Sequence, residues 1–181
     1  MFLNILIVFI TLLYPLAIWF GEGYIEPRWL SGVLLMAILL RIPLLKVNKA
    51  GKWLMFGALI LMALAVFNNA LLPLKLYPVL VNAGMLAIFG YSLVYPPSIV
   101  ERIARIKEPD LPVQAIMYTR KVTQVWCIFF VLNGSVALVT SVWASHAVWS
   151  LYNGVIAYVL MGVLFSVEYL FRLRFKRRHN V

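Results

Sequence analysis

The sequence has few groups from which a catalytic or metal site could be built. It contains one cysteine, Cys127, two histidines and six acidic residues. A single cysteine excludes a disulfide within the chain and a multi-cysteine zinc site. The sequence also has no phosphate-binding glycine loop, no H-E-x-x-H and no G-x-S-x-G motif. It therefore predicts no cofactor, no metal site and no catalytic residue set.

Hydrophobic side chains are abundant, at 64% of the chain, and the mean hydropathy is +0.95. Soluble proteins are only about 45–50% apolar. Charged residues make up 12% of the chain, too few for a separate soluble domain. The sequence predicts one integral membrane domain over residues 1–181, an all-α transmembrane bundle. The net charge of +10 then reflects basic residues at cytoplasmic helix ends, with no nucleic-acid partner.

Six windows are long and apolar enough to cross a bilayer core of about 30 Å. They cover residues 2–20, 29–46, 52–72, 77–96, 122–142 and 148–171. The first lacks a basic leader and a small-residue cleavage site, which predicts a retained helix. Only "PLKLY" separates the third and fourth windows, which predicts a tight helical hairpin there. Five spans remain an alternative, because the apolar run before Arg41 is short.

The basic residues predict the orientation of the bundle. Fourteen of the sixteen lie in the stretches 41–52, 98–121 and 172–178. Lys and Arg resist translocation, so these stretches should be cytoplasmic. Six spans with both termini in the cytoplasm place all three basic stretches on the cytoplasmic side. Residues 172–181 are then a basic cytoplasmic tail.

The predicted cytoplasmic loop, residues 98–121, contains a short helix. Ser98 and Glu101 have the spacing of a capping box. Isoleucines recur on one side of the helix that follows, at positions 99, 103 and 106. Two interpretations stay open: an amphipathic helix in the lipid headgroup layer, or a docking surface for an acidic partner.

Glu168 lies near the cytoplasmic end of the last window, where a carboxylate is costly. It could pair with Arg41 across the bundle, or with Arg172 one turn away while Arg41 snorkels, or it could belong to a functional site. We expect a polar cluster on this face of the membrane, made of Arg41, Glu101, Arg102, Tyr118, Arg120, Lys121, Glu168 and Arg172.

A second polar set comprises Asn82, Asn133 and Asn153. Helix counting places Asn133 near mid-membrane and the other two nearer the outer side. The set predicts either interhelical hydrogen bonds or a polar lining for a lipid or solute cavity. Four glycines are expected to allow close helix approach: Gly84, Gly90, Gly154 and Gly162. His146, between Trp143 and Trp149, is expected in an interfacial aromatic belt.

Three segments resemble a known family: "YPVLVNAGMLAIFGYSLVYPPSIVERIAR", "MYTRKVTQVWCIFFVLNGSVAL" and "WSLYNGVIAYVLMGVLFSVEYLFRLR". They are similar to small, uncharacterised bacterial inner-membrane proteins encoded among acyl carrier protein, ketosynthase and acyltransferase genes, including aryl-polyene clusters. The resemblance covers residues 77–174. It implies a multi-pass protein of the bacterial inner membrane that takes part in the synthesis or transfer of acyl or polyene chains. The expected partners are membrane lipids, other membrane subunits and an acidic acyl carrier protein.

Three functions are compatible with these observations. The first is a non-enzymatic anchor, scaffold or accessory subunit of an acyl-lipid or aryl-polyene synthesis or export system. The second is a small lipid or solute transporter or flippase, which needs a continuous cavity joining the asparagines to the cytoplasmic cluster. The third is an acyl or lipid transferase using Glu168 or Tyr118.

Overall fold

The computed structural model describes residues 71–179 continuously and isolated positions between 15 and 67, without the side chains at 176, 178 and 179. All regular structure in this part of the chain is helical. Three segments are long and apolar enough to cross a membrane: Leu71–Val94, Val113–Trp143 and His146–Phe175. The chain is thus a helical membrane protein. The predicted windows 2–20 and 29–46 and most of 52–72 lie outside the described residues, so six spans and their topology stay predictions.

The first described span does not have the hairpin predicted at "PLKLY". Helix α4 (Leu71–Lys75) continues into α5 (Tyr77–Val94) with only Leu76 between them. Pro73 and Pro78 both stand in the first turn of a helix, where a missing amide hydrogen costs little. The "PLKLY" stretch therefore contains a one-residue break in a nearly continuous helical segment and no chain reversal.

Helix α6 (Ile99–Ala104) is the short helix that the capping pattern predicts. The Ser98 hydroxyl accepts a hydrogen bond from the Glu101 amide at 3.4 Å. The Glu101 side chain does not complete a reciprocal capping box, because it binds the Arg105 guanidinium instead. Ile103 is exposed, as expected for a helix with an apolar face toward lipid.

Helix α7 (Val113–Trp143) begins before position 122, where the predicted fifth span starts. Pro112 occupies its N-cap, a position that needs no amide hydrogen. The hydroxyls of Thr119 and Thr123 bind backbone carbonyls within the helix, which satisfies these polar groups locally. Residues 113–121 are therefore the first turns of a long helix and do not belong to the loop.

The last segment consists of α8 (His146–Leu151), a π-helical turn η2 (Tyr152–Ile156) and α9 (Ala157–His179). The tight turn before α8 is capped by Ser145, whose hydroxyl accepts from the Val148 amide. Helix α9 continues past position 171, so the predicted basic tail is helical through His179.

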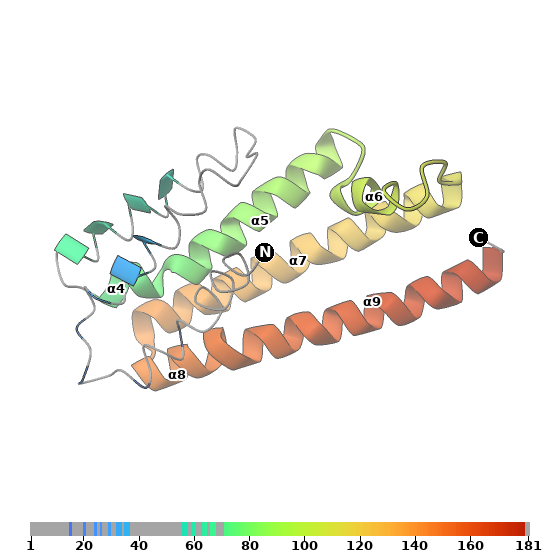
Figure 1. The fold of residues 1–181 in the computed structure, drawn as a ribbon. Coiled ribbons are helices and arrows are strands. Elements are labelled where there is room, and N and C mark those ends of the chain that lie inside the picture. The colour runs from blue at the N-terminus through green and yellow to red at the C-terminus, as the bar shows by residue number, and fades with distance from the viewer. Residues whose placement is uncertain are drawn as a thin grey trace.

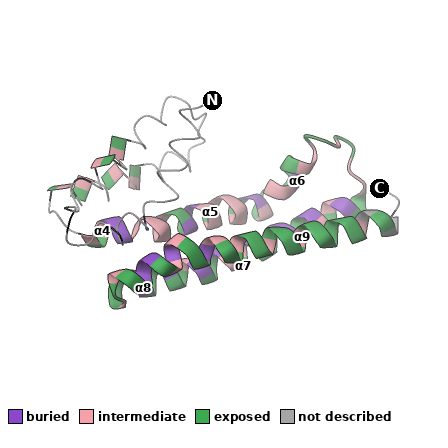
Figure 2. Ribbon diagram, turned by 60° about the horizontal axis from the view of Figure 1, so that its bottom comes forward, coloured by how far each residue is buried: buried purple, intermediate pink, exposed green. Residues whose placement is uncertain are grey.

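Helices α5, α7 and α9 lie side by side in an up-down-up order (Figure 1). Helix α6, the start of α7 and the end of α9 share one end of the bundle, and α4 and α8 share the other. Buried residues follow the contact between α5 and α7, whereas much of α9 is exposed (Figure 2). Nearly all the basic residues from position 71 onward belong to the α6 end, which is the predicted cytoplasmic end.

Candidate functional site

A cavity of about 900 Å³ runs along the bundle between α5, α7 and α9. Its lining includes Asn82 and Asn153 at the α8 end and Glu168 and Arg172 at the α6 end. Fifteen residues separate Asn153 from Glu168. At 1.5 Å per residue this corresponds to about 22 Å. The cavity is therefore elongated and reaches along most of a hydrocarbon core.

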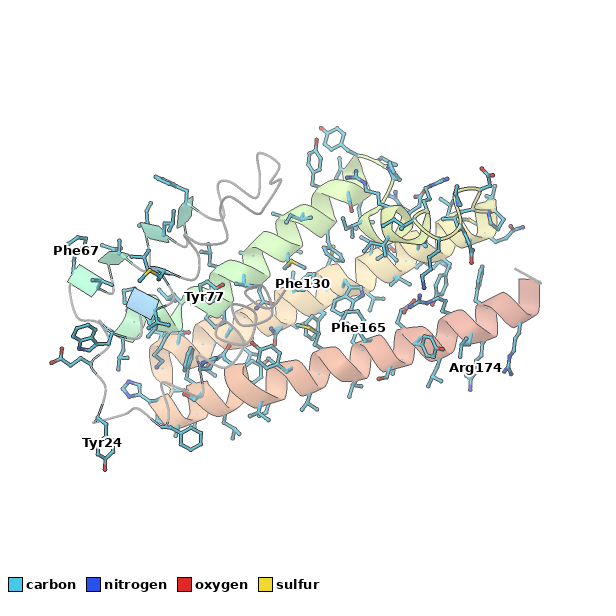
Figure 3. The ribbon with its side chains drawn as sticks, in the orientation of Figure 1. Tyr24, Phe67, Tyr77, Phe130, Phe165 and Arg174 are labelled. Atoms are coloured by element: carbon cyan, nitrogen blue, oxygen red, sulfur yellow. The ribbon has the colours of Figure 1, made fainter. Side chains whose placement is uncertain are left out.

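Aromatic side chains form the middle of the cavity wall. Trp126 and Phe130 of α7 are buried, and Phe89 of α5 meets Phe130 edge-on with ring centroids 5.2 Å apart. Phe165 of α9 approaches Trp126 with a centroid separation of 4.5 Å. Figure 3 shows Phe130 and Phe165 in the middle of the bundle, and Tyr77 toward the α4 end. These large side chains bridge α7 and α9 and leave an apolar channel beside them.

Three residues of the predicted cytoplasmic cluster meet at the α6 end of the cavity. Glu168 forms an ion pair with Arg172 at 2.5 Å, and its other carboxylate oxygen accepts a bond from the Tyr118 hydroxyl at 3.3 Å. The Glu168 side chain is 11% exposed and that of Arg172 is 49% exposed. Phe175 stacks on the Tyr118 ring. Of the partners considered for Glu168, the structure therefore shows Arg172, together with Tyr118.

Among the described members of that cluster, Glu168 has no hydrogen bond or ion pair with the remaining residues. Glu101 is buried and paired with Arg105, and the Arg102 guanidinium donates to the Pro97 carbonyl. Arg120 and Lys121 are exposed on α7. Arg41 is outside the described residues, so its predicted pairing with Glu168 stays a prediction.

The asparagines form the polar end of the cavity near α8. The Asn133 amide group donates to the Asn82 side-chain oxygen at 3.0 Å, which joins α7 to α5. The Tyr152 hydroxyl donates to the Asn133 side-chain oxygen at 2.9 Å, which joins η2 to α7. Asn153 donates to the Trp149 carbonyl and to the Thr140 hydroxyl. The predicted interhelical hydrogen bonds are thus present, and the same asparagines line the cavity. A lipid or solute in this cavity stays a prediction.

Several contributors to the site were not found by sequence reasoning. The buried residues of α7 recur every three or four positions, a pattern typical of one packed helix face; they include Ala115, Thr119, Val122, Trp126, Phe130, Asn133, Ala137 and Thr140. That spacing was available in the sequence. The depth of the cavity cannot be read from the sequence, because it depends on the distance between α9 and α7.

At the α8 end, the two tryptophans that flank His146 differ in exposure, and an interfacial aromatic belt there stays a prediction. Trp143 is exposed, but Trp149 is fully buried, and its indole N–H donates to the Lys75 carbonyl and the Ser141 hydroxyl. The Lys75 ammonium lies 5.9 Å from the centroid of the Trp149 ring and donates to the Ala144 carbonyl. Lys75 and Trp149 thus pack against each other at the α8 end of the bundle.

Comparisons of the chain with protein-family models, with curated proteins and with solved structures find no match. The candidate site is therefore defined by geometry alone: an elongated apolar cavity with amides at one end and a carboxylate, a phenol and a guanidinium at the other.

Proposed function

We propose that the protein is a non-enzymatic membrane component that holds one long-chain amphiphile in this cavity, as an accessory subunit for acyl-lipid or polyene assembly or export. The observation that carries the proposal is the cavity itself, whose volume of about 900 Å³ lies within the usual range for ligand sites. A chain would occupy the aromatic middle, and its head group would lie at the α6 end.

The distribution of charge favours an anionic head group. Lys107 and Arg172 line the α6 end and are exposed, whereas the Glu168 carboxylate is largely covered and already paired. The lining also includes Glu108, so its two basic and two acidic side chains balance, and the positive excess comes from the basic residues around the cavity mouth. Arg120 and Lys121 add positive charge nearby on α7. An apolar cavity left empty would also lose dispersion contacts along its wall, which favours occupation by a hydrocarbon chain.

The proposal is tested by equilibrium binding of radiolabelled palmitate to the purified protein in detergent. Ala157 is buried and lines the cavity, so Ala157→Phe should fill part of the space that the chain needs. We expect palmitate affinity to fall about tenfold, equivalent to 1.4 kcal/mol. Val159 is 58% exposed on the same helix, so Val159→Phe adds the same ring outside the cavity and should leave affinity unchanged.

Two results would contradict the proposal. One is a lack of saturable palmitate binding to the unmodified chain in its folded state. The other is equal loss of affinity in both variants, which would indicate a general effect of a larger side chain on α9.

Transport of the chain across the bilayer is a second candidate, favoured by the extension of the cavity from the asparagines to Glu168. It predicts that the protein in liposomes makes a fluorescent lipid of the inner leaflet accessible to an impermeant quencher, and that Ala157→Phe slows this exchange. Exchange at the rate of protein-free liposomes would exclude transport and leave the binding proposal standing.

A further inference from the structure

At the α8 end of the cavity, the Asn153 side-chain oxygen has no hydrogen-bond donor among the described residues. The side-chain oxygens of Asn82 and Asn133 each accept a bond, from Asn133 and Tyr152 respectively. Asn153 uses its amide N–H groups, toward Thr140 and Trp149. Its side-chain oxygen accepts no hydrogen bond from residues 71–179 or the other described positions.

Asn153 is also deeply placed. It is 5% exposed, it lines the cavity, and it lies in the π-helical turn η2. Such turns are rare and occur frequently at functional sites. Among the described residues, the fully enclosed side-chain polar atom without a partner is the Ser150 hydroxyl, so the Asn153 oxygen is reachable from the cavity. A group that enters the cavity and donates a hydrogen bond would find an open acceptor there.

We infer that the amphiphile carries a hydroxyl group at the end of its chain opposite the anionic head, and that this hydroxyl donates to the Asn153 side-chain oxygen. The inference rests on the proposed function, because it concerns the far end of the same ligand. A hydroxyl is the group that fits, since the open position is an acceptor and the charged residues that line the cavity all lie at the α6 end. A plain hydrocarbon end would leave the oxygen unpaired.

The geometry also sets the length of the ligand. The distance along the helices from Asn153 to Glu168 is about 22 Å, and that to Arg172 is about 28 Å, from the helical rise per residue. A long, extended chain is needed to place a head group near Lys107 and Arg172 while its other end reaches Asn153. Sites that hydrogen-bond a ligand hydroxyl discriminate against analogues that lack it.

The test compares palmitate with ω-hydroxypalmitate, which differ by the terminal hydroxyl alone, on the full-length protein in detergent. We expect the hydroxylated chain to bind about fivefold more tightly, the effect of one ordinary hydrogen bond. In Asn153→Leu the ratio of the two dissociation constants should fall to about one. Ser166→Ala removes an exposed α9 hydroxyl that binds the Gly162 carbonyl, and it should keep the ratio of the unmodified chain.

Each outcome separates this inference from the proposed function. Saturable binding of both ligands with equal affinity contradicts the inferred hydroxyl contact with Asn153. It leaves the proposal of chain binding intact. Binding of neither ligand overturns both. A preference for the hydroxylated chain that survives Asn153→Leu overturns the assignment to Asn153. If Asn153→Leu does not fold, the comparison on the unmodified chain still decides, because equal affinities there exclude the inference.

Discussion

Glu168 shows how one carboxylate is accommodated near the end of an apolar helix. Its two oxygens have different partners, the Arg172 guanidinium on the same helix and the Tyr118 hydroxyl on α7. The exposed fractions of the pair differ, at 11% for the carboxylate side chain and 49% for the guanidinium side chain. Water can therefore hydrate the cation if the pair is broken, but it reaches the anion poorly.

This asymmetry predicts unequal costs for removing the two charges. Arg172→Gln leaves a mostly buried carboxylate without its cation and should lower the free energy of unfolding by about 1–3 kcal/mol. Glu168→Gln keeps an acceptor for Tyr118 and leaves a hydrated arginine, so its cost should stay within about 1 kcal/mol. Denaturant titration of the detergent-solubilised protein measures both values, and the double variant should resemble Glu168→Gln.

The opposite order would contradict this account of the pair. A larger cost for Glu168→Gln would indicate a second cation that depends on the carboxylate, for which Arg41 is the residue predicted from the sequence. The sequence could propose Arg172 from its spacing of four residues. It could not choose between Arg172 and Arg41, because that choice depends on side-chain direction and on the position of Tyr118.

At the scale of helices, α5 and α7 approach closely at Gly134. A Cβ added at Gly134 would lie 3.0 Å from the Asn82 Cβ, tighter than nearly all contacts of this kind. By contrast, a Cβ added at Gly90 or Gly162 would meet nothing within 4 Å. Of the four glycines predicted at close helix contacts, Gly84 is buried in α5, whereas Gly90 and Gly162 face open space. Gly134 was not among the four, since glycine composition alone does not show which helix face is packed. Close approach at Gly154 stays a prediction.

We therefore expect Gly134→Ala to separate α5 from α7 and to weaken the bond between Asn82 and Asn133. Overpacking of this kind costs about 1–3 kcal/mol of unfolding free energy. Gly90→Ala is the matched control in α5, and it should be neutral or stabilising by up to about 1 kcal/mol, because alanine is the better helix former. Equal stability of the two variants in a denaturant titration would show that the helices do not meet at Gly134.

The boundaries of these helices were only partly predictable from hydropathy. The window 77–96 agrees closely with α5, because apolar composition and helix coincide there. The window starting at 122 misses the first turns of α7, which include the charged residues Arg120 and Lys121. A hydropathy window ends at charged residues, whereas a helix ends where its backbone hydrogen bonds end.

For the molecule as a whole, the sequence predicts the helical membrane class and the collection of basic residues at one end. It does not predict the cavity, whose wall combines residues far apart in the chain, such as Phe89, Ala104, Trp126 and Phe165. Each looks like an ordinary apolar residue in its own segment. Their convergence depends on the spacing of α9 from α7, which is set by aromatic contacts between residues far apart in the chain.

The central claim, that a chain amphiphile occupies this cavity, is tested most directly by photo-crosslinking with a palmitate analogue that carries a diazirine in mid-chain. Residue-level mass spectrometry should locate the adducts on the cavity wall, at Met85 or Met161, and excess palmitate should suppress them in a saturable manner. Adducts confined to exposed α9 positions such as Val159 and Val163, unaffected by excess palmitate, would contradict the account.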